Sequence, residues 1–230
     1  MSSTRFTVES KRNIFNHYHN NMKIIGINIL VFTVVCLYSL PALAQETRSV
    51  YRKTVTVGGQ DSRAAYGGFV DLRRGKVYTL DEATAVQDQV DMLYGYGKNT
   101  KSNIMAVSSR SRDYFGRRYR DRLHEWTELN RGTFIAVENT REQRKIFKEI
   151  QTAGQLRQAF EAGLKTVENR PDYDRGAHGP SSHRLRRLKE NEMIYFKSIY
   201  REGVYAAFKV VEIREGEQGY IKLDLITVGN

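Results

Sequence analysis

The sequence predicts a single α+β domain, built from a mainly antiparallel sheet with two or three short helices packed on it. Two patterns lead to this fold class. Short runs of alternating apolar and polar residues, separated by glycine-containing turns, recur in residues 67–97 and 193–228 and are typical of strands. Two segments within residues 140–164 instead place apolar residues at i, i+3 and i+4, which is typical of amphipathic helices. No repeat, low-complexity tract or linker divides the chain.

Residues 22–44 have the pattern of a secretory signal peptide. Lys23 precedes an apolar block at residues 24–38, and Ala42-Leu43-Ala44 forms an Ala-x-Ala cleavage motif. We therefore expect the protein to be exported, to the periplasm or the extracellular space, and to be associated with the cell envelope.

An uncleaved membrane anchor is the alternative interpretation of this segment. Gly26 and Asn28 would make residues 24–40 a marginal membrane span. The polar residues 1–21 precede a second methionine, Met22, and we interpret them as an extension upstream of the true start.

The predicted mature chain, residues 45–230, contains no cysteine, because Cys36 lies inside the apolar block. Disulfides, thiol catalysis and cysteine-based zinc or iron–sulfur sites are therefore excluded. The remaining 186 residues suit one domain with a sizeable core and no transmembrane span. A cysteine-free exported chain fits a bacterial envelope better than an animal secreted protein.

The elements of the first half centre on residues 67–97, which we expect to form a strand, a tight turn, a second strand, a short helix and a third strand. Gly75 supplies the positive φ that the tight turn needs. Thr79 and Glu82 have the spacing of a capping box and predict a helix start. A strand at residues 50–57 precedes this unit.

The second half begins with a polar loop at residues 98–103 and a short strand at residues 104–107. Residues 108–122 lack aliphatic side chains and contain Gly116, so we expect an exposed loop there, with room for one helical turn. Two capping boxes predict helices over residues 140–150 and 152–164. The other expected elements are a strand at 133–137, a loop at 168–182, and strands at 193–198, 204–213 and 220–228.

Four segments together resemble secreted envelope proteins of Gram-negative bacteria. These are Phe-Val-Asp-Leu-x-x-Gly-Lys-Val-Tyr (69–78), Val-Asp-Met-Leu-Tyr (90–94), Trp-x-x-x-Asn-x-x-Thr-Phe (126–134) and Val-Tyr-Ala-Ala-Phe-Lys-Val (204–210). The resemblance covers most of residues 66–230. It implies an envelope location and a β-rich domain, and it implies no activity or catalytic residue.

Positive charge in the mature chain is concentrated in two segments. The mature chain has a net charge of +8, and residues 110–122 and 183–189 each contribute +4. Arginine matches phosphate, sulfate and carboxylate oxygens, and aromatic faces accept sugars or bases. The alternative is a solvated loop whose arginines pair with local acids. The candidate ligand-binding residues are Arg110, Arg112, Arg117, Arg118, Tyr119, Arg120, Arg122, Arg184, Arg186 and Arg187.

We consider the loop at residues 172–183 as a metal site because it contains aspartates and histidines. Residues 172–183 begin like a calcium loop, but Gly176 falls at the fifth position and His183 stands where a bidentate glutamate is needed. The i, i+5 spacing of His178 and His183 suits neither a helix face nor a strand face, so we expect a surface loop. We therefore predict no metal, no cofactor and no catalytic residue.

The sequence thus favours an exported, non-enzymatic envelope protein that binds an anionic ligand or surface through its arginine-rich segments. The expected partners are an anionic glycan, a lipid headgroup or an acidic protein, while nucleic acid is not favoured outside the cytoplasm. A structural subunit of an envelope assembly is the first alternative. A glycan or peptide hydrolase is the second, since spatial pairs of carboxylates or of Ser and His are invisible in a sequence.

Overall fold

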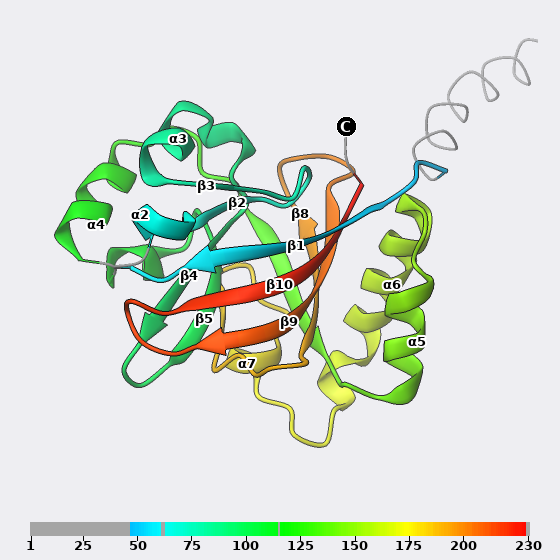
Figure 1. Cartoon of the computed structure of the whole chain (residues 1–230). Coiled ribbons are helices and arrows are strands. Elements are labelled where there is room, and N and C mark those ends of the chain that lie inside the picture. Colours follow the sequence, from blue (N-terminus) through cyan, green and yellow to red (C-terminus); the bar gives the residue numbers. More distant parts are fainter. Residues whose placement is uncertain (1–46, 61–62, 115, 229–230) are drawn as a thin grey trace, which may run out of the picture. The chain divides into compact units, whose positions relative to one another are not determined.

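The computed structural model describes residues 47–60, 63–114 and 116–228 (Figure 1). The predicted upstream extension and signal peptide, residues 1–44, lie outside these ranges. Three apolar clusters are built entirely from the described residues, and residues 46–230 form one compact unit. This part of the chain therefore has a core of its own.

The α+β prediction is confirmed, and the described strands divide between two antiparallel sheets of five strands each. The first sheet has the order β1-β10-β9-β8-β6, and the second has the order β3-β2-β4-β5-β7. In the first sheet the strands are β1 Tyr51–Gly58, β6 Gly132–Val137, β8 Met193–Ser198, β9 Tyr205–Arg214 and β10 Tyr220–Thr227; in the second they are β2 Phe69–Asp71, β3 Lys76–Tyr78, β4 Met92–Gly97, β5 Lys101–Ala106 and β7 Arg184–Arg186.

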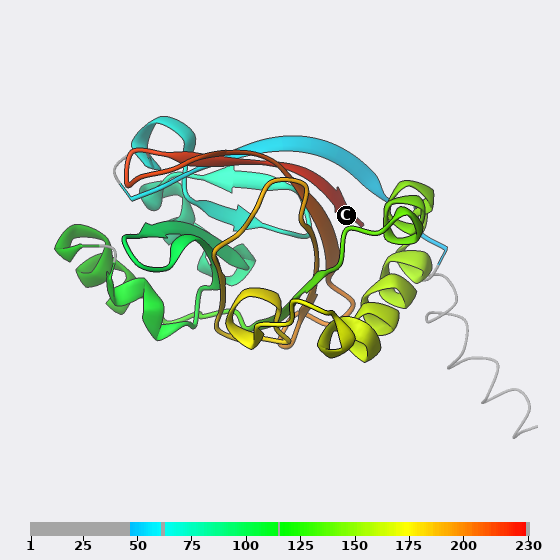
Figure 2. The same ribbon diagram turned by 90° about the horizontal axis from the view of Figure 1, so that it is seen from below.

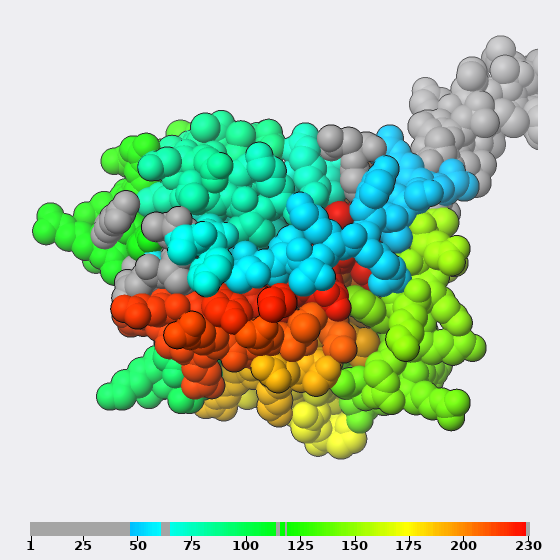
Figure 3. Space-filling view, in the orientation of Figure 1, coloured from blue at the N-terminus to red at the C-terminus, as the bar shows by residue number. Residues whose placement is uncertain are grey.

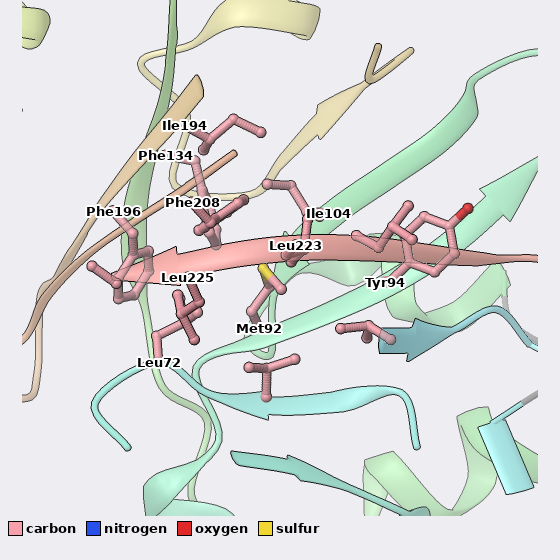
Figure 4. Packing of buried hydrophobic residues seen from close by; sticks show 14 of the residues in the cluster. Leu72, Met92, Tyr94, Ile104, Phe134, Ile194, Phe196, Phe208, Leu223 and Leu225 are labelled. Atoms are coloured by element: carbon pink, nitrogen blue, oxygen red, sulfur yellow. The ribbon is translucent and has the colours of Figure 1, made fainter. Parts of the chain in front are cut away.

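The main core lies between the two sheets (Figure 4). Alternate residues of each strand point into it, as the period of two in a strand requires. Leu223 and Leu225 of β10 meet Met92 and Ile104 of the second sheet in this cluster. Both sheets thus bury one face against each other, and this layer carries most of the large apolar side chains.

Two helices, α5 (Arg141–Glu149) and α6 (Ala153–Thr166), cover part of the outer face of the first sheet (Figure 2). Gly163 lets α6 approach closely, since a Cβ atom there would lie 2.9 Å from side-chain atoms of Ile135 and Val137. The rest of that face, over β1, β10 and β9, is the surface seen in Figure 3. Asp224 of β10 is exposed, while its neighbours Leu223 and Leu225 are buried.

The outer face of the second sheet is covered by α3 (Leu80–Ala85) and α4 (Arg117–His124), through a third apolar cluster that includes Phe69 and Trp126. The indole of Trp126 donates to Thr84 Oγ1 over 3.1 Å and so joins α3 to the segment after α4. The remaining helical segments are α2 Arg63–Tyr66, α7 Arg175–His178 and the 3₁₀ turns η1 Gln87–Gln89, η2 Arg110–Tyr114 and η3 Val167–Asn169.

The local predictions near α3 and α6 are confirmed. Thr79 and Glu82 form both halves of a capping box, and so do Thr152 and Gln155. Gly75 has a φ of 60°, as the turn between β2 and β3 requires. No helix in the described ranges is long and apolar enough to cross a membrane.

Two predictions of loops between residues 98 and 122 are wrong. The predicted polar loop at 98–103 overlaps β5, which already begins at Lys101. Residues 108–122 are not an exposed loop, since they contain η2 and most of α4. Gly116, with a φ of 84°, ends one helical segment and lets the next begin in a new direction, so it separates two helices instead of preventing them.

Candidate anion-binding surface

Helix α4 exposes arginines to solvent, and its apolar residues pack on the second sheet. Leu123 is fully buried and Tyr119, one turn earlier, packs against the same cluster under the helix. Tyr119 is half-buried and therefore helps to hold α4 on the sheet. The side chain of Arg117 is 88% exposed, and those of Arg120 and Arg122 are 45% exposed.

The arginines of α4 pair with few acids. Arg117 Nε lies 3.2 Å from Asp121 Oδ2, and Arg120 Nε lies 3.1 Å from Asp121 Oδ1. Both guanidinium groups therefore share one carboxylate, and the hydrogen bond from Arg120 is the largest cause that lowers the pKa of Asp121. Arg122 Nη1 lies 3.1 Å from Glu125. Arg118 belongs to the same helix, but its side chain lies outside the described part of the structure. Among the described side chains, Arg117 and Arg120 outnumber the one carboxylate that they share.

The two arginines of η2 have different surroundings. Arg110 is exposed, whereas the side chain of Arg112 is only 13% exposed and its Nη1 donates to the carbonyl of Val107 over 2.8 Å. Burial lowers the pKa of Arg112. Arg112 thus fastens η2 to the end of β5, and its prediction as an exposed ligand group does not fit this position.

A histidine and an aspartate join η2 to α4. His124 Nε2 and Asp113 Oδ1 are 2.7 Å apart, and Asp113 also lies 3.9 Å from Arg112. The two helical segments on either side of Gly116 are therefore held together by polar contacts, and each carries exposed arginines. We call Arg110, Arg117, Arg120 and Arg122 the α4 surface.

The second basic segment forms β7 at the edge of the second sheet. Leu185 points into the core between the sheets, so Arg184 and Arg186 point outward. Arg184 lies opposite Met105 in the ladder with β5, and Met105 packs in the same cluster as Leu123 of α4. Residues directly opposite each other in a ladder point to the same face. The side chain of Arg184 therefore points to the outer side of this sheet, which α4 also covers.

Local acids occupy part of the β7 segment. Arg186 Nη2 lies 3.3 Å from Asp174 Oδ1, and Arg187 Nη1 lies 3.9 Å from Asp174 Oδ2. Within the described residues, no hydrogen bond or ion pair joins an arginine of β7 to η2 or α4. The two basic segments thus share a face of the sheet but remain separate clusters.

A buried charge cluster that the sequence did not reveal lies at the β8–β9 turn. Arg201 Nη1 lies 2.7 Å from Asp91 Oδ2 and 3.2 Å from Asp71 Oδ1, and it also donates to the carbonyl of Gln89. Both aspartates have no exposed surface. Burial raises the pKa of Asp91 to about 7, and Arg201 opposes this shift. The only sequence signal is a charge inside an apolar run at each aspartate.

A second cluster corrects the prediction of a surface loop at His178. The His178 side chain is only 5% exposed, and its Nδ1 accepts a hydrogen bond from the backbone amide of Asp174. Its Nε2 faces Asp172 at 3.9 Å and Glu192 at 4.0 Å. Burial lowers the pKa of His178 and raises the pKa of Glu192. No group of three or more potential metal ligands occurs in the described residues.

Comparisons of the chain with protein-family models, with curated proteins and with solved structures each give no match. What the protein can do must therefore be inferred from its side chains. The carboxylates at Asp71 and Asp91 are closed to solvent and already bound to Arg201, so in this conformation they cannot contact a substrate. The exposed guanidinium groups of α4 remain the groups most able to bind a ligand, because each presents a fork of N–H donors that fits an oxyanion.

Proposed function

We propose that this protein is an exported, non-enzymatic envelope protein that binds an anionic ligand through the α4 surface. The observation that carries the proposal is the sharing of Asp121 by Arg117 and Arg120, whose side chains are 88% and 45% exposed. A helix with more guanidinium groups than carboxylates is suited to bind a phosphate, sulfate or carboxylate group.

The existing ion pairs do not prevent such binding. Exposed pairs contribute little to stability, because water screens the charges and two long side chains lose freedom. An incoming oxyanion can therefore replace Asp121 as the partner of Arg117 at small cost. Leu123 and Tyr119 hold the helix on the sheet, so its attachment does not depend on this ion pair.

Export supports the choice of ligand class. The apolar block at residues 24–38 and the cleavage motif at 42–44 favour a location where acidic glycans, lipid phosphates and acidic proteins occur. Nucleic acid is not the expected polyanion there. We take a sulfated polysaccharide as the probe, because it presents many oxyanions without a bilayer.

The test is a titration of residues 45–230 with dextran sulfate at several salt concentrations. Binding to a polyanion releases counterions, so the logarithm of the affinity should fall linearly with the logarithm of the salt concentration. The double variant Arg117→Ala/Arg120→Ala should weaken binding and reduce the slope by about 2, roughly one per lost contact. A matched control, Lys165→Ala/Arg214→Ala, removes the same charge from exposed positions elsewhere.

Equal behaviour of the two double variants would assign binding to net charge and would contradict a site on α4. The additional variant Arg184→Ala/Arg187→Ala tests whether the β7 segment contributes to dextran sulfate binding. A loss similar to that of the α4 variant would extend the site along the outer side of the second sheet, and an unchanged slope would confine it to α4.

A further inference from the structure

Helix α5 carries a row of cations on one side. Arg141, Arg144, Lys145 and Lys148 are all exposed and follow the spacing i, i+3, i+4 and i+7, which places them along one face. Phe147 of the helix, and Ile150 directly after it, pack in the apolar cluster against the first sheet instead. The helix is therefore amphipathic, with a basic outer side about 10 Å long from the rise of 1.5 Å per residue.

The start of the described chain adds two more cations at the end of this row. The backbone carbonyl of Arg48 accepts from the amide of Ala153, just after α5. Arg52 donates through Nη2 to the carbonyls of Phe147, Lys148 and Ile150 at 2.8–3.0 Å. These carbonyls form the negative end of the helix dipole, which favours a guanidinium there. Figure 2 shows β1 arriving beside α5 and α6.

Few acids offset this charge. Glu149 lies 3.9 Å from Lys145, and Glu142 is the other acid of the helix. Arg144 donates to the carbonyl and side chain of Asn139, which carry no charge. Among the described residues, Arg141 and Lys148 have no carboxylate within 4 Å. We call Arg48, Arg52, Arg141, Arg144, Lys145 and Lys148 the α5 surface; with its two glutamates it has a net charge of +4.

The position of the α5 surface along the chain points to its partner. The apolar block at residues 24–38 ends only eight residues before Thr47, where the described structure begins. Eight extended residues span at most about 30 Å. While that block lies in a bilayer, during export or as a retained anchor, Thr47 stays within this reach of the lipid headgroups, and Arg48 of the α5 surface is the next residue.

We propose that the α5 surface docks on an anionic lipid bilayer, with its cations against the lipid phosphates. Charge complementarity and the short connection to the apolar block both favour a bilayer over a soluble partner. A basic segment next to an anionic membrane gains about fivefold in partitioning for each lysine or arginine near the surface. This docking is independent of ligand binding by α4.

The test measures binding of residues 45–230 to vesicles by sedimentation. Vesicles of phosphatidylcholine with 30% phosphatidylglycerol are compared with vesicles of phosphatidylcholine alone. The variant Arg144→Gln/Lys145→Gln/Lys148→Gln should lose about 100-fold in partitioning onto the anionic vesicles, from about fivefold for each of three cations. The control Lys98→Gln/Lys165→Gln/Arg214→Gln removes the same charge from other exposed positions and should lose far less.

Two outcomes would overturn the proposal: equal losses in the two triple variants, or equal binding of the unaltered domain to both kinds of vesicle. The reverse substitution Glu142→Gln/Glu149→Gln should strengthen binding, and an unchanged affinity would also count against the α5 surface. None of these substitutions touches a buried side chain, so all variants should keep their thermal midpoints.

Failure of this proposal is distinguishable from failure of the proposed function. The α4 variant Arg117→Ala/Arg120→Ala should bind anionic vesicles like the unaltered domain but should bind dextran sulfate more weakly. The α5 triple variant should bind dextran sulfate normally and anionic vesicles more weakly. Loss of vesicle binding in the α4 variant alone would place the lipid contact on α4 and reject the α5 surface.

Discussion

The arginines of α4 and Arg201 make the same kind of ion pair in very different surroundings. Arg117 holds Asp121 at 3.2 Å on a surface where the arginine side chain is 88% exposed. Arg201 holds Asp91 at 2.7 Å where the aspartate has no exposed surface and the arginine is 14% exposed. The distances differ little, but the solvent around the charges differs greatly.

This difference separates arginines that hold the fold from arginines that can bind a ligand. Water screens the pairs on α4, so a partner can be exchanged at small cost. The pair at Arg201 excludes water, so removal of either member leaves a buried charge uncompensated. Arg201 also joins the β8–β9 turn of the first sheet to Asp71 and Asp91 of the second, so it serves as a cross-link between the sheets.

The largest effect should come from removing this cross-link. Arg201→Met leaves two buried carboxylates with one fewer partner and should lower the free energy of unfolding by about 3–5 kcal/mol at pH 8. Urea unfolding followed by circular dichroism measures it. Arg74→Met is the matched control, because Arg74 also binds Asp71 but its side chain is 37% exposed. This control should lower the free energy of unfolding by much less. Similar losses in both variants would contradict the contrast between buried and exposed pairs.

A pH series should sharpen the comparison through Asp91. Its pKa is about 7 in the folded protein, above the ordinary value of 3.8, because burial disfavours the charged carboxylate. A raised pKa means that the folded state binds the proton more tightly than the unfolded state. The contribution of protonated Asp91 to the free energy of unfolding is therefore complete below pH 4 and is lost as the pH rises through 7.

The variant Asp91→Asn isolates this contribution. Between pH 5 and 7, the free energy of unfolding of the unaltered protein should fall relative to the variant by up to about 1.4 kcal/mol per pH unit, and the difference should level off above pH 7. Urea unfolding at four pH values checks it. Parallel pH profiles for the two proteins would show that Asp91 titrates normally.

His178 should give a smaller effect of the opposite sign. Burial lowers its pKa below 6.5, so the folded state prefers the neutral ring and loses stability as the pH falls through the folded pKa. His178→Asn keeps an acceptor for the amide of Asp174 but cannot be protonated. The variant should flatten the acid side of the stability profile below pH 6.5. An unchanged slope there would mean that His178 gains enough from Asp172 and Glu192 to stay charged.

The sequence was most informative where the interactions are local. Thr79 and Glu82 are three residues apart, so their capping box could be predicted from spacing alone, and so could the turn at Gly75. The division of the strands into two sheets and the pairing of Arg201 with Asp91, 110 residues apart, depend on long-range packing. No pattern of residue types within a short window can show such a pair.

The charge count illustrates the same limit. The mature chain outside residues 110–122 and 183–189 has a net charge near zero, which suggests no further basic surface. Folding nevertheless brings Arg52 to the end of α5 beside Lys148, 96 residues away, so that the cations there outnumber the two glutamates of the helix. A neutral sum over many residues therefore does not exclude a strongly basic surface once the chain folds.

The smallest effect on stability should come from α4, and it completes the comparison with Arg201. Arg117→Ala/Arg120→Ala should shift the thermal midpoint by less than about 2 °C, since exposed pairs and surface positions contribute little. The same variant should weaken dextran sulfate binding and lower its salt slope. Differential scanning fluorimetry and the binding titration together check this separation. A large fall in the midpoint would show that Asp121 needs both arginines for the fold, and the α4 arginines would then resemble Arg201 and would no longer be free to exchange Asp121 for a ligand.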